Sequence, residues 1–230
     1  LSSSRSLDKR HLIDNWKNFT DSNTEVSVIT YIEKIIQKSI RYRDLFKYGT
    51  NSRLVYGSQD GLPGLIVDGY LNSVFIQINS AGIEKYRNDV KKIISDITKK
   101  ECFIIDDQKR RELECLPFWE NEVGKLEYVS IEENNFKRKI PINKIQKNGY
   151  YYDHRENRNK LESFIKRYNK SLEKGLDLFS YIGSWGFHLL RAGVKDVVFV
   201  DQGDFDEIIT EDIKVNKLQN SFSFVREDVF

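Results

Sequence analysis

The spacing of hydrophobic positions changes along this chain and predicts two kinds of element. Helices are predicted at 28–48, 83–99, 155–169, 185–192 and 205–218. The grounds are apolar residues at helical intervals or a position between two predicted strands. Short β-prone runs bounded by turn formers give predicted strands at 53–58, 65–70, 73–79, 102–105, 123–131, 136–142, 176–179, 196–201 and 222–225. The first helix is expected to end near Gly49 and to bury one face, made of Ile29, Ile32, Ile36, Ile40 and Phe46.

The order of these elements divides the chain into three parts. Residues 1–27 are polar and predict a linker or the remnant of an N-terminal RNA-binding domain. Residues 28–143 mix hairpins with helices, which is typical of a small α+β domain. Residues 144–230 alternate helix and strand, which predicts right-handed βαβ units and a parallel, Rossmann-like sheet. Only three strands are expected there, so we interpret 144–230 as the N-terminal half of a truncated α/β domain.

Composition narrows the function classes without choosing one. With 39% hydrophobic and 13% aromatic residues, the 230-residue chain can bury a sizeable core. A net charge of +2 means that any nucleic-acid surface must be a local patch. Cys102 and Cys115 lack metal-ligand spacing and suit a reducing compartment, so we expect a cytoplasmic protein without a metal. No apolar run is long enough to span a membrane.

The stretch 175–186 predicts a ligand site at the carboxyl edge of the parallel sheet. It joins an apolar strand to a helix through a turn at Gly183, which aims backbone N–H groups at one point. Asp177 is expected at the end of the first strand, Asp201 at the end of the second and Asp228 at the end of the third, around one crevice. Asp201 is placed to accept from two ribose hydroxyls, and Asp228 from an adenine amino group. Because a G-x-G-x-x-G phosphate cradle is missing, an adenosine ligand without pyrophosphate fits better than NAD.

Three stretches carry a resemblance to a known family. They are RLVYGSQDGLPGLIVDGY (53–70), QKNGYYYDHRENR (146–158) and DLFSYIGSWGFHLLRAGVKDVVFVD (177–201), in that order. Together they resemble the class I S-adenosylmethionine-dependent methyltransferases of the large-subunit ribosomal RNA cytosine-5 type. The resemblance implies a partial class I methyltransferase domain behind the small α+β domain, with S-adenosylmethionine as cofactor.

The resemblance also implies roles for individual residues. Those expected to bind the cofactor are Gln146, Tyr152, Asp153, Arg155, Phe179, Ser180, Tyr181, Gly183, Asp201 and Asp228. The implied chemistry is methylation at carbon 5 of a cytosine that is splayed out of the RNA, with a cysteine thiolate adding to carbon 6. The family's Pro-Pro motif and nucleophilic cysteine would lie beyond Phe230. No catalytic residue is therefore expected here, and the chain as given is expected to lack methyl transfer.

Other interpretations remain open. The expected partner is ribosomal RNA, and a homodimer is an open alternative for the oligomeric state. The chain could instead belong to a class I methyltransferase with another RNA site or a small-molecule substrate, or be a truncated, non-catalytic module that binds RNA or a partner. His154 and His188 lack partners spaced for a metal site or a triad. We expect His154 at the surface or the domain junction, and His188 on the helix at 185–192, packed under the sheet.

Overall fold

The computed structural model describes residues 24–49, 51–120, 122–124, 126–145, 150–168 and 171–230, with side chains from Val28 onward. Contacts within the chain form two compact units. Of the described residues, unit 1 contains those up to 68 and from 74 to 122, and unit 2 contains 69–73 and those from 123 onward. The domain boundary predicted at residue 143 stays a prediction, although contacts group 123–143 with the later strands.

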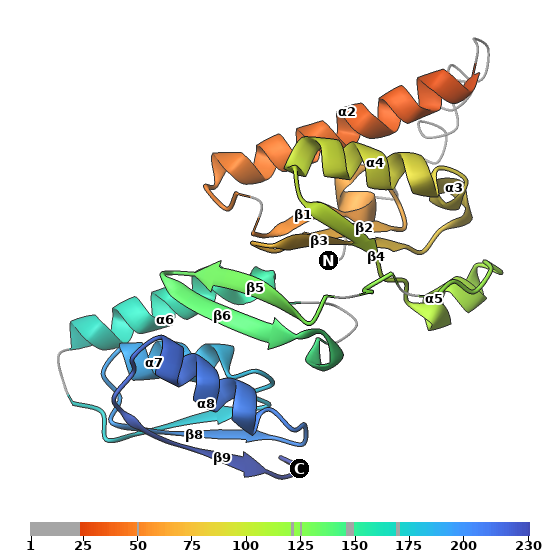
Figure 1. Cartoon of the computed structure of the whole chain (residues 1–230). Coiled ribbons are helices and arrows are strands. Elements are labelled where there is room, and N and C mark those ends of the chain that lie inside the picture. The colour runs from red at the N-terminus through yellow and green to blue at the C-terminus, as the bar shows by residue number, and fades with distance from the viewer. Residues whose placement is uncertain (1–23, 50, 121, 125, 146–149, 169–170) are drawn as a thin grey trace, which may run out of the picture. The chain divides into compact units, whose positions relative to one another are not determined.

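Unit 1 contains a four-stranded sheet with the strand order β1-β2-β3-β4 (Figure 1). The strands are β1 (Arg53–Tyr56), β2 (Leu65–Gly69), β3 (Ser73–Ile78) and β4 (Glu101–Ile104). The helices are α2 (Thr24–Leu45), α3 (Ala81–Glu84), α4 (Arg87–Thr98) and α5 (Gln108–Leu113), with the 3₁₀ turn η1 (Gly57–Asp60). Figure 1 shows α2 and α4 lying together over this sheet, where Ile36, Leu54 and Ile94 are fully buried.

The helix predicted at 28–48 is confirmed, but its end and one of its core positions were wrong. Ile32, Ile36 and Ile40 are buried as expected, whereas Phe46 is 53% exposed. The helix ends at Leu45, and Lys47 already has a left-handed φ of 59°, so Gly49 is not its cap. Because the chain leaves the helix before it reaches Phe46, that ring packs at the surface against the rings of Tyr42 and Tyr48.

The hairpin predicted over 53–68 is confirmed. Strands β1 and β2 pair antiparallel with Tyr56 opposite Ile66, and η1 lies between them. The Asp60 carboxylate fixes the turn, because it accepts two hydrogen bonds from the Arg43 guanidinium, at 2.7 and 2.6 Å, and one from the Tyr56 N–H. The helix predicted at 83–99 is divided into α3 and α4, and α5 was not predicted.

Unit 2 contains the predicted parallel sheet, with strand order β7-β8-β9. Its strands are β5 (Tyr128–Glu133), β6 (Phe136–Pro141), β7 (Lys174–Leu178), β8 (Asp196–Asp201) and β9 (Ser221–Arg226). Its helices are α6 (Arg155–Tyr168), α7 (Ser184–Arg191) and α8 (Asp206–Val215), with the 3₁₀ turns η2 (Ile142–Lys144) and η3 (Tyr152–His154). Strands β5 and β6 form the predicted hairpin.

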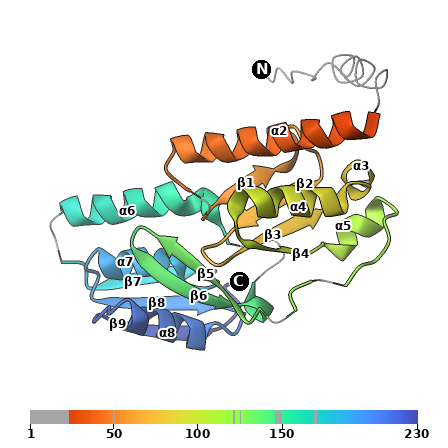
Figure 2. The same ribbon diagram turned by 45° about the horizontal axis from the view of Figure 1, so that its top comes forward.

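The two faces of the parallel sheet differ in burial. Both crossovers, through α7 and α8, run in the same direction across the sheet, so right-handed connections place both helices on one face (Figure 2). That face contains Val197 and Phe199, which are fully buried. On the alternate positions, Leu176 and Leu178 are 57% and 46% exposed. Asp177 is paired with Phe199 in the β7–β8 register, so its side chain lies on the same face of the sheet, under the helices.

Candidate functional site

The loop between β7 and α7 has an unusual backbone conformation. Phe179, Tyr181 and Gly183 have left-handed φ values of 55°, 49° and 76°. For the two aromatic residues this conformation is strained, and such strain persists where the surroundings enforce it, often at binding sites. At Gly183 a side chain is excluded as well, because a Cβ atom would lie 2.9 Å from Cε1 of Phe199. This loop leads directly into the N-terminus of α7, as the sequence predicted.

Asp201 connects this loop to the end of β8. Its Oδ2 accepts a hydrogen bond from the Tyr181 N–H at 2.7 Å, and its Oδ1 accepts one from the Gly203 N–H at 2.8 Å. A carboxylate has about four acceptor positions, so each oxygen can still accept a hydroxyl. Asp201 is partly exposed. The arrangement can therefore hold a vicinal diol at the carboxyl edge of the sheet.

Ser180 supplies an unpaired polar group beside Asp201. Its N–H donates to the Val200 carbonyl at 3.0 Å, which holds the loop against β8. Its Oγ is buried and has no hydrogen-bond partner among the residues that the structure describes. A buried hydroxyl without a partner is costly, and a ligand with a polar group would relieve that cost.

The aromatic residues of the loop point in different directions. The Tyr181 side chain is 9% exposed, packs against the rings of Tyr151 and Phe205, and donates its hydroxyl to the Lys144 carbonyl. Phe179 is 56% exposed and lies against the ring of Phe230. Tyr181 thus anchors the loop, while Phe179 leaves an apolar surface at the rim.

Asp177 lies beneath the loop, on the buried face of the sheet. Its Oδ2 accepts a hydrogen bond from the Gly186 N–H at 2.7 Å, which ties β7 to the first turn of α7. Burial raises the pKa of Asp177 to about 7, and the nearby Asp201 charge contributes in the same direction. Asp177 therefore supports the loop from below, whereas Asp201 is open to a ligand.

The remaining residues that the sequence predicted lie in three places. Gln146 lies outside the described residues. Asp228 is exposed, two residues beyond Arg226, which is paired with Asp201 across the β8–β9 ladder. Tyr152, Asp153 and Arg155 surround the start of α6: the Tyr152 hydroxyl donates to the Gly69 carbonyl, and the Arg155 guanidinium lies over the Tyr152 ring. The structure thus brings Phe179, Ser180, Tyr181, Gly183 and Asp201 together and groups the α6 residues separately.

Two buried clusters that the sequence did not predict support the site. His188 lies between two carboxylates, with Nδ1 at 2.7 Å from Glu162 and Nε2 at 3.4 Å from Glu133. Glu133 also accepts two hydrogen bonds of 2.7 Å from Arg158. In the second cluster, the Arg138 guanidinium donates to the Ser184 hydroxyl and to the Ile182 carbonyl, at the end of the loop before α7. These partners are 25 or more residues apart in sequence, so no local pattern could have indicated them.

The described residues contain neither a metal-binding cluster nor a membrane-spanning helix. Among the described residues, no group of three or more His, Cys, Asp or Glu side chains could hold a metal ion. The helices of the described part of the chain include none that is long and apolar enough to cross a membrane. Cys102 is buried and Cys115 is exposed, and both belong to unit 1.

Comparisons with known proteins identify the fold. No family model matches the chain. It is 33% identical over 212 residues, 88% of its length, to Ribosomal RNA large subunit methyltransferase I of Escherichia coli, and covers 52% of that protein. The enzyme of the same name from Cronobacter sakazakii is 31% identical over 222 residues, with 92% of this chain and 54% of that protein covered. The chain spans about half the length of these curated relatives.

The solved structures agree with this class of fold. A Streptococcus mutans protein assigned as a SAM-dependent methyltransferase matches with a TM-score of 0.66 and 18% identity, over 88% of this chain and 53% of that one. Trm5b of Pyrococcus abyssi matches with a TM-score of 0.54 and 16% identity, over 70% and 47%. The predicted fold class is confirmed: an α/β chain with the partial Rossmann-like fold of SAM-dependent methyltransferases, preceded by a smaller α+β unit.

Proposed function

We propose that this chain is the cofactor-binding part of an S-adenosylmethionine-dependent RNA methyltransferase. The observation that carries the proposal is the hydrogen bond between Asp201 and the strained loop 179–183 at the carboxyl ends of β7 and β8. The likeness to two ribosomal RNA methyltransferases supports RNA as the substrate class. The α+β unit and the parallel sheet occur in the same chain, as the resemblance implied.

The residues present fit this cofactor. Asp201 has acceptor positions for two ribose hydroxyls, and the buried Ser180 Oγ lacks a partner among the described residues. Phe179 offers an exposed apolar ring, and Asp228 an exposed carboxylate for an amino group. Gln146, Tyr152, Asp153 and Arg155 complete the proposed set. S-adenosylmethionine, when bound, supplies an electrophilic methyl group on its sulfonium.

The finer proposal is that the parent enzyme forms 5-methylcytosine in large-subunit ribosomal RNA. A base in folded RNA must be splayed out to reach such a pocket. The chain as given holds cysteines only at 102 and 115, and its three prolines, at 63, 117 and 141, form no adjacent pair. We therefore propose that these 230 residues bind the cofactor without transferring the methyl group.

Calorimetric titration with S-adenosylhomocysteine tests the cofactor assignment. Asp201→Ala removes the proposed ribose acceptor and should weaken binding by about 1–3 kcal/mol. Asp201→Asn retains one acceptor oxygen, which can still bind a backbone N–H of the loop. This variant therefore distinguishes the loss of ligand contacts from disorder of the loop. Asp196→Ala is the matched control, because Asp196 begins the same strand at its opposite end. Equal affinities for wild type and both Asp201 variants would remove this residue from the site.

A further inference from the structure

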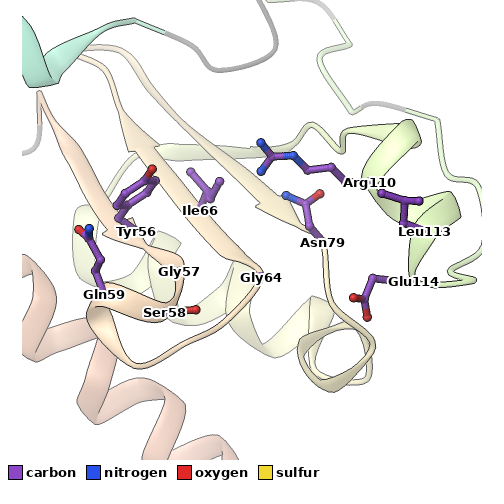
Figure 3. A pocket seen from close by; sticks show the side chains of 10 residues that line it. All are labelled: Tyr56, Gly57, Ser58, Gln59, Gly64, Ile66, Asn79, Arg110, Leu113 and Glu114. Carbon is purple, nitrogen blue, oxygen red and sulfur yellow. The ribbon is translucent and has the colours of Figure 1, made fainter. Parts of the chain in front are cut away.

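Unit 1 contains a hollow that the proposed function does not use. It has a volume of about 490 Å³, within the range of roughly 300–1,000 Å³ that is typical of ligand pockets. Its walls come from the β1–β2 hairpin, the residue after β3, and α5 (Figure 3). The polar lining residues are Tyr56, Ser58, Gln59, Asn79, Arg110 and Glu114. Three of them lie in the 53–70 motif, whose role the cofactor site leaves unexplained.

The Asn79 side chain is the lining group whose hydrogen-bonding capacity is left unused by the residues that the structure describes. Its amide nitrogen and amide oxygen are both buried, and neither has a hydrogen-bond partner among the described residues. In the view of Figure 3, Asn79 and Arg110 lie at one end of the pocket, Tyr56 at the other, and Ile66 between them. A primary amide presents a donor and an acceptor side by side, which matches the edge of a nucleobase.

The glycine turn of the motif holds Asn79 in this position. The Asn79 N–H donates to the Gly64 carbonyl at 2.8 Å, and Ser80 Oγ donates to the Pro63 carbonyl at 2.8 Å. Gly64 has a φ of 85°, and a Cβ atom there would lie 2.4 Å from the Ser80 Cβ. The Leu62-Pro63-Gly64 turn therefore brings the backbone close enough to fix Asn79, which lines the pocket.

Two lining side chains offer partners for a phosphate and for hydroxyl groups. The Arg110 side chain is 53% exposed, and its ion pair with Asp107 is long, at 3.7 Å, so its guanidinium can bind a phosphate. The Glu114 carboxylate lies in the same lining and can accept ribose hydroxyls. The Tyr56 ring is 43% exposed, with the Arg53 guanidinium 5.0 Å from its centroid, and can stack with a base.

We propose that this pocket binds one nucleotide, with the base edge on Asn79 and the phosphate on Arg110. The inference rests on the proposed function for one point, that the nucleotide belongs to a single-stranded part of an RNA substrate. The same chemistry would also admit a free nucleotide. A nucleotide in this pocket would give the 53–70 motif a role in ligand recognition in addition to its hairpin structure.

The test measures binding of fluorescently labelled hexaadenylate RNA to the full chain, with AMP and an abasic hexamer as competitors. Asn79→Leu removes both amide groups at similar volume and should weaken hexaadenylate binding about 5- to 150-fold. Because it also removes an unpaired buried amide, its melting temperature should equal or exceed that of wild type. Arg110→Ala should weaken binding, whereas Lys109→Ala, an exposed cation on the same helix outside the lining, should leave it unchanged.

The competitors distinguish the two sources of the ligand. If AMP competes at the same concentration as unlabelled hexaadenylate, the site is assigned to a free nucleotide. If hexaadenylate binds at least tenfold more tightly than AMP, the site is assigned to RNA. Wild-type affinity in Asn79→Leu, or equal competition by the abasic strand, overturns the inference. Titration of the same variants with S-adenosylhomocysteine keeps the two proposals apart, since Asn79→Leu should retain wild-type affinity and Asp201→Ala should bind more weakly.

Discussion

The guanidinium of Arg138 in β6 donates from Nε to the carboxylate of Asp212 in α8 at 2.8 Å, and both side chains are almost fully buried. Its other nitrogens donate to the Ser184 hydroxyl at 2.9 Å and to the Ile182 carbonyl. The β5–β6 hairpin thereby holds the end of the loop that contains Tyr181 and Gly183. A residue more than 40 positions away in sequence is thus a positioning residue for the candidate site.

Arg138→Met should strongly destabilise unit 2. The substitution leaves the Asp212 carboxylate buried without its cation, and removing one partner of such a pair typically costs about 3–5 kcal/mol. Urea denaturation of the full chain, followed by circular dichroism, measures the change in unfolding free energy. An unchanged denaturation midpoint would contradict the buried pairing.

The double variant Arg138→Met/Asp212→Asn separates stability from positioning. Neutralising Asp212 removes the unpaired charge, so much of the lost stability should return. The contacts to Ser184 and Ile182 remain absent, so affinity for S-adenosylhomocysteine should stay below that of wild type. Recovery of full affinity together with stability would show that Arg138 acts on folding alone.

Asp177 should make stability fall as pH rises. Burial raises its pKa to about 7, so between pH 4 and pH 7 the folded chain holds a proton that the unfolded chain has released. This contribution is complete below the unfolded pKa and is lost as pH rises through about 7. Asp177→Asn should remove the loss, and at pH 8 it should be more stable than wild type by up to about 4 kcal/mol. Denaturation curves of both proteins at pH 5 and pH 8 measure this difference. An equal change in unfolding free energy for wild type and Asp177→Asn between the two pH values would contradict the assignment.

Glu133 should have the opposite dependence. Burial would raise its pKa, but hydrogen bonds from His188 and Arg158 outweigh burial and hold the pKa at about 2. Its stabilising contribution is therefore complete above the unfolded pKa, near 4.5, and is lost as pH falls toward 2. Between pH 6 and pH 3, wild type should lose more stability than Glu133→Gln, by about 1–3 kcal/mol. Acid denaturation followed by tryptophan fluorescence measures the difference.

Local sequence patterns predicted the elements and the carboxyl-edge site because those features depend on neighbouring residues. The spacing from Gly183 to Asp201 follows from one strand–helix–strand unit, and the structure joins the two through the Tyr181 N–H. Phe46 was wrongly predicted to be buried, because the helical spacing of apolar residues continues past Leu45, where the helix ends. The contacts of Glu133 with His188 and the pocket at Asn79 depend on side chains that only the tertiary fold brings together.

The 230-residue chain should bind S-adenosylhomocysteine and yet transfer no methyl group to RNA. Carbon-5 methylation of cytosine requires a thiolate nucleophile at the base, and the two cysteines lie in unit 1, outside the unit that holds Asp201. Burial raises the pKa of the Cys102 thiol, which opposes thiolate formation. Incubation with methyl-tritiated S-adenosylmethionine and a large-subunit ribosomal RNA transcript should leave the RNA unlabelled. Labelling above the protein-free blank would contradict this, and its loss in Cys115→Ser but not Cys102→Ser would identify the exposed cysteine as the nucleophile.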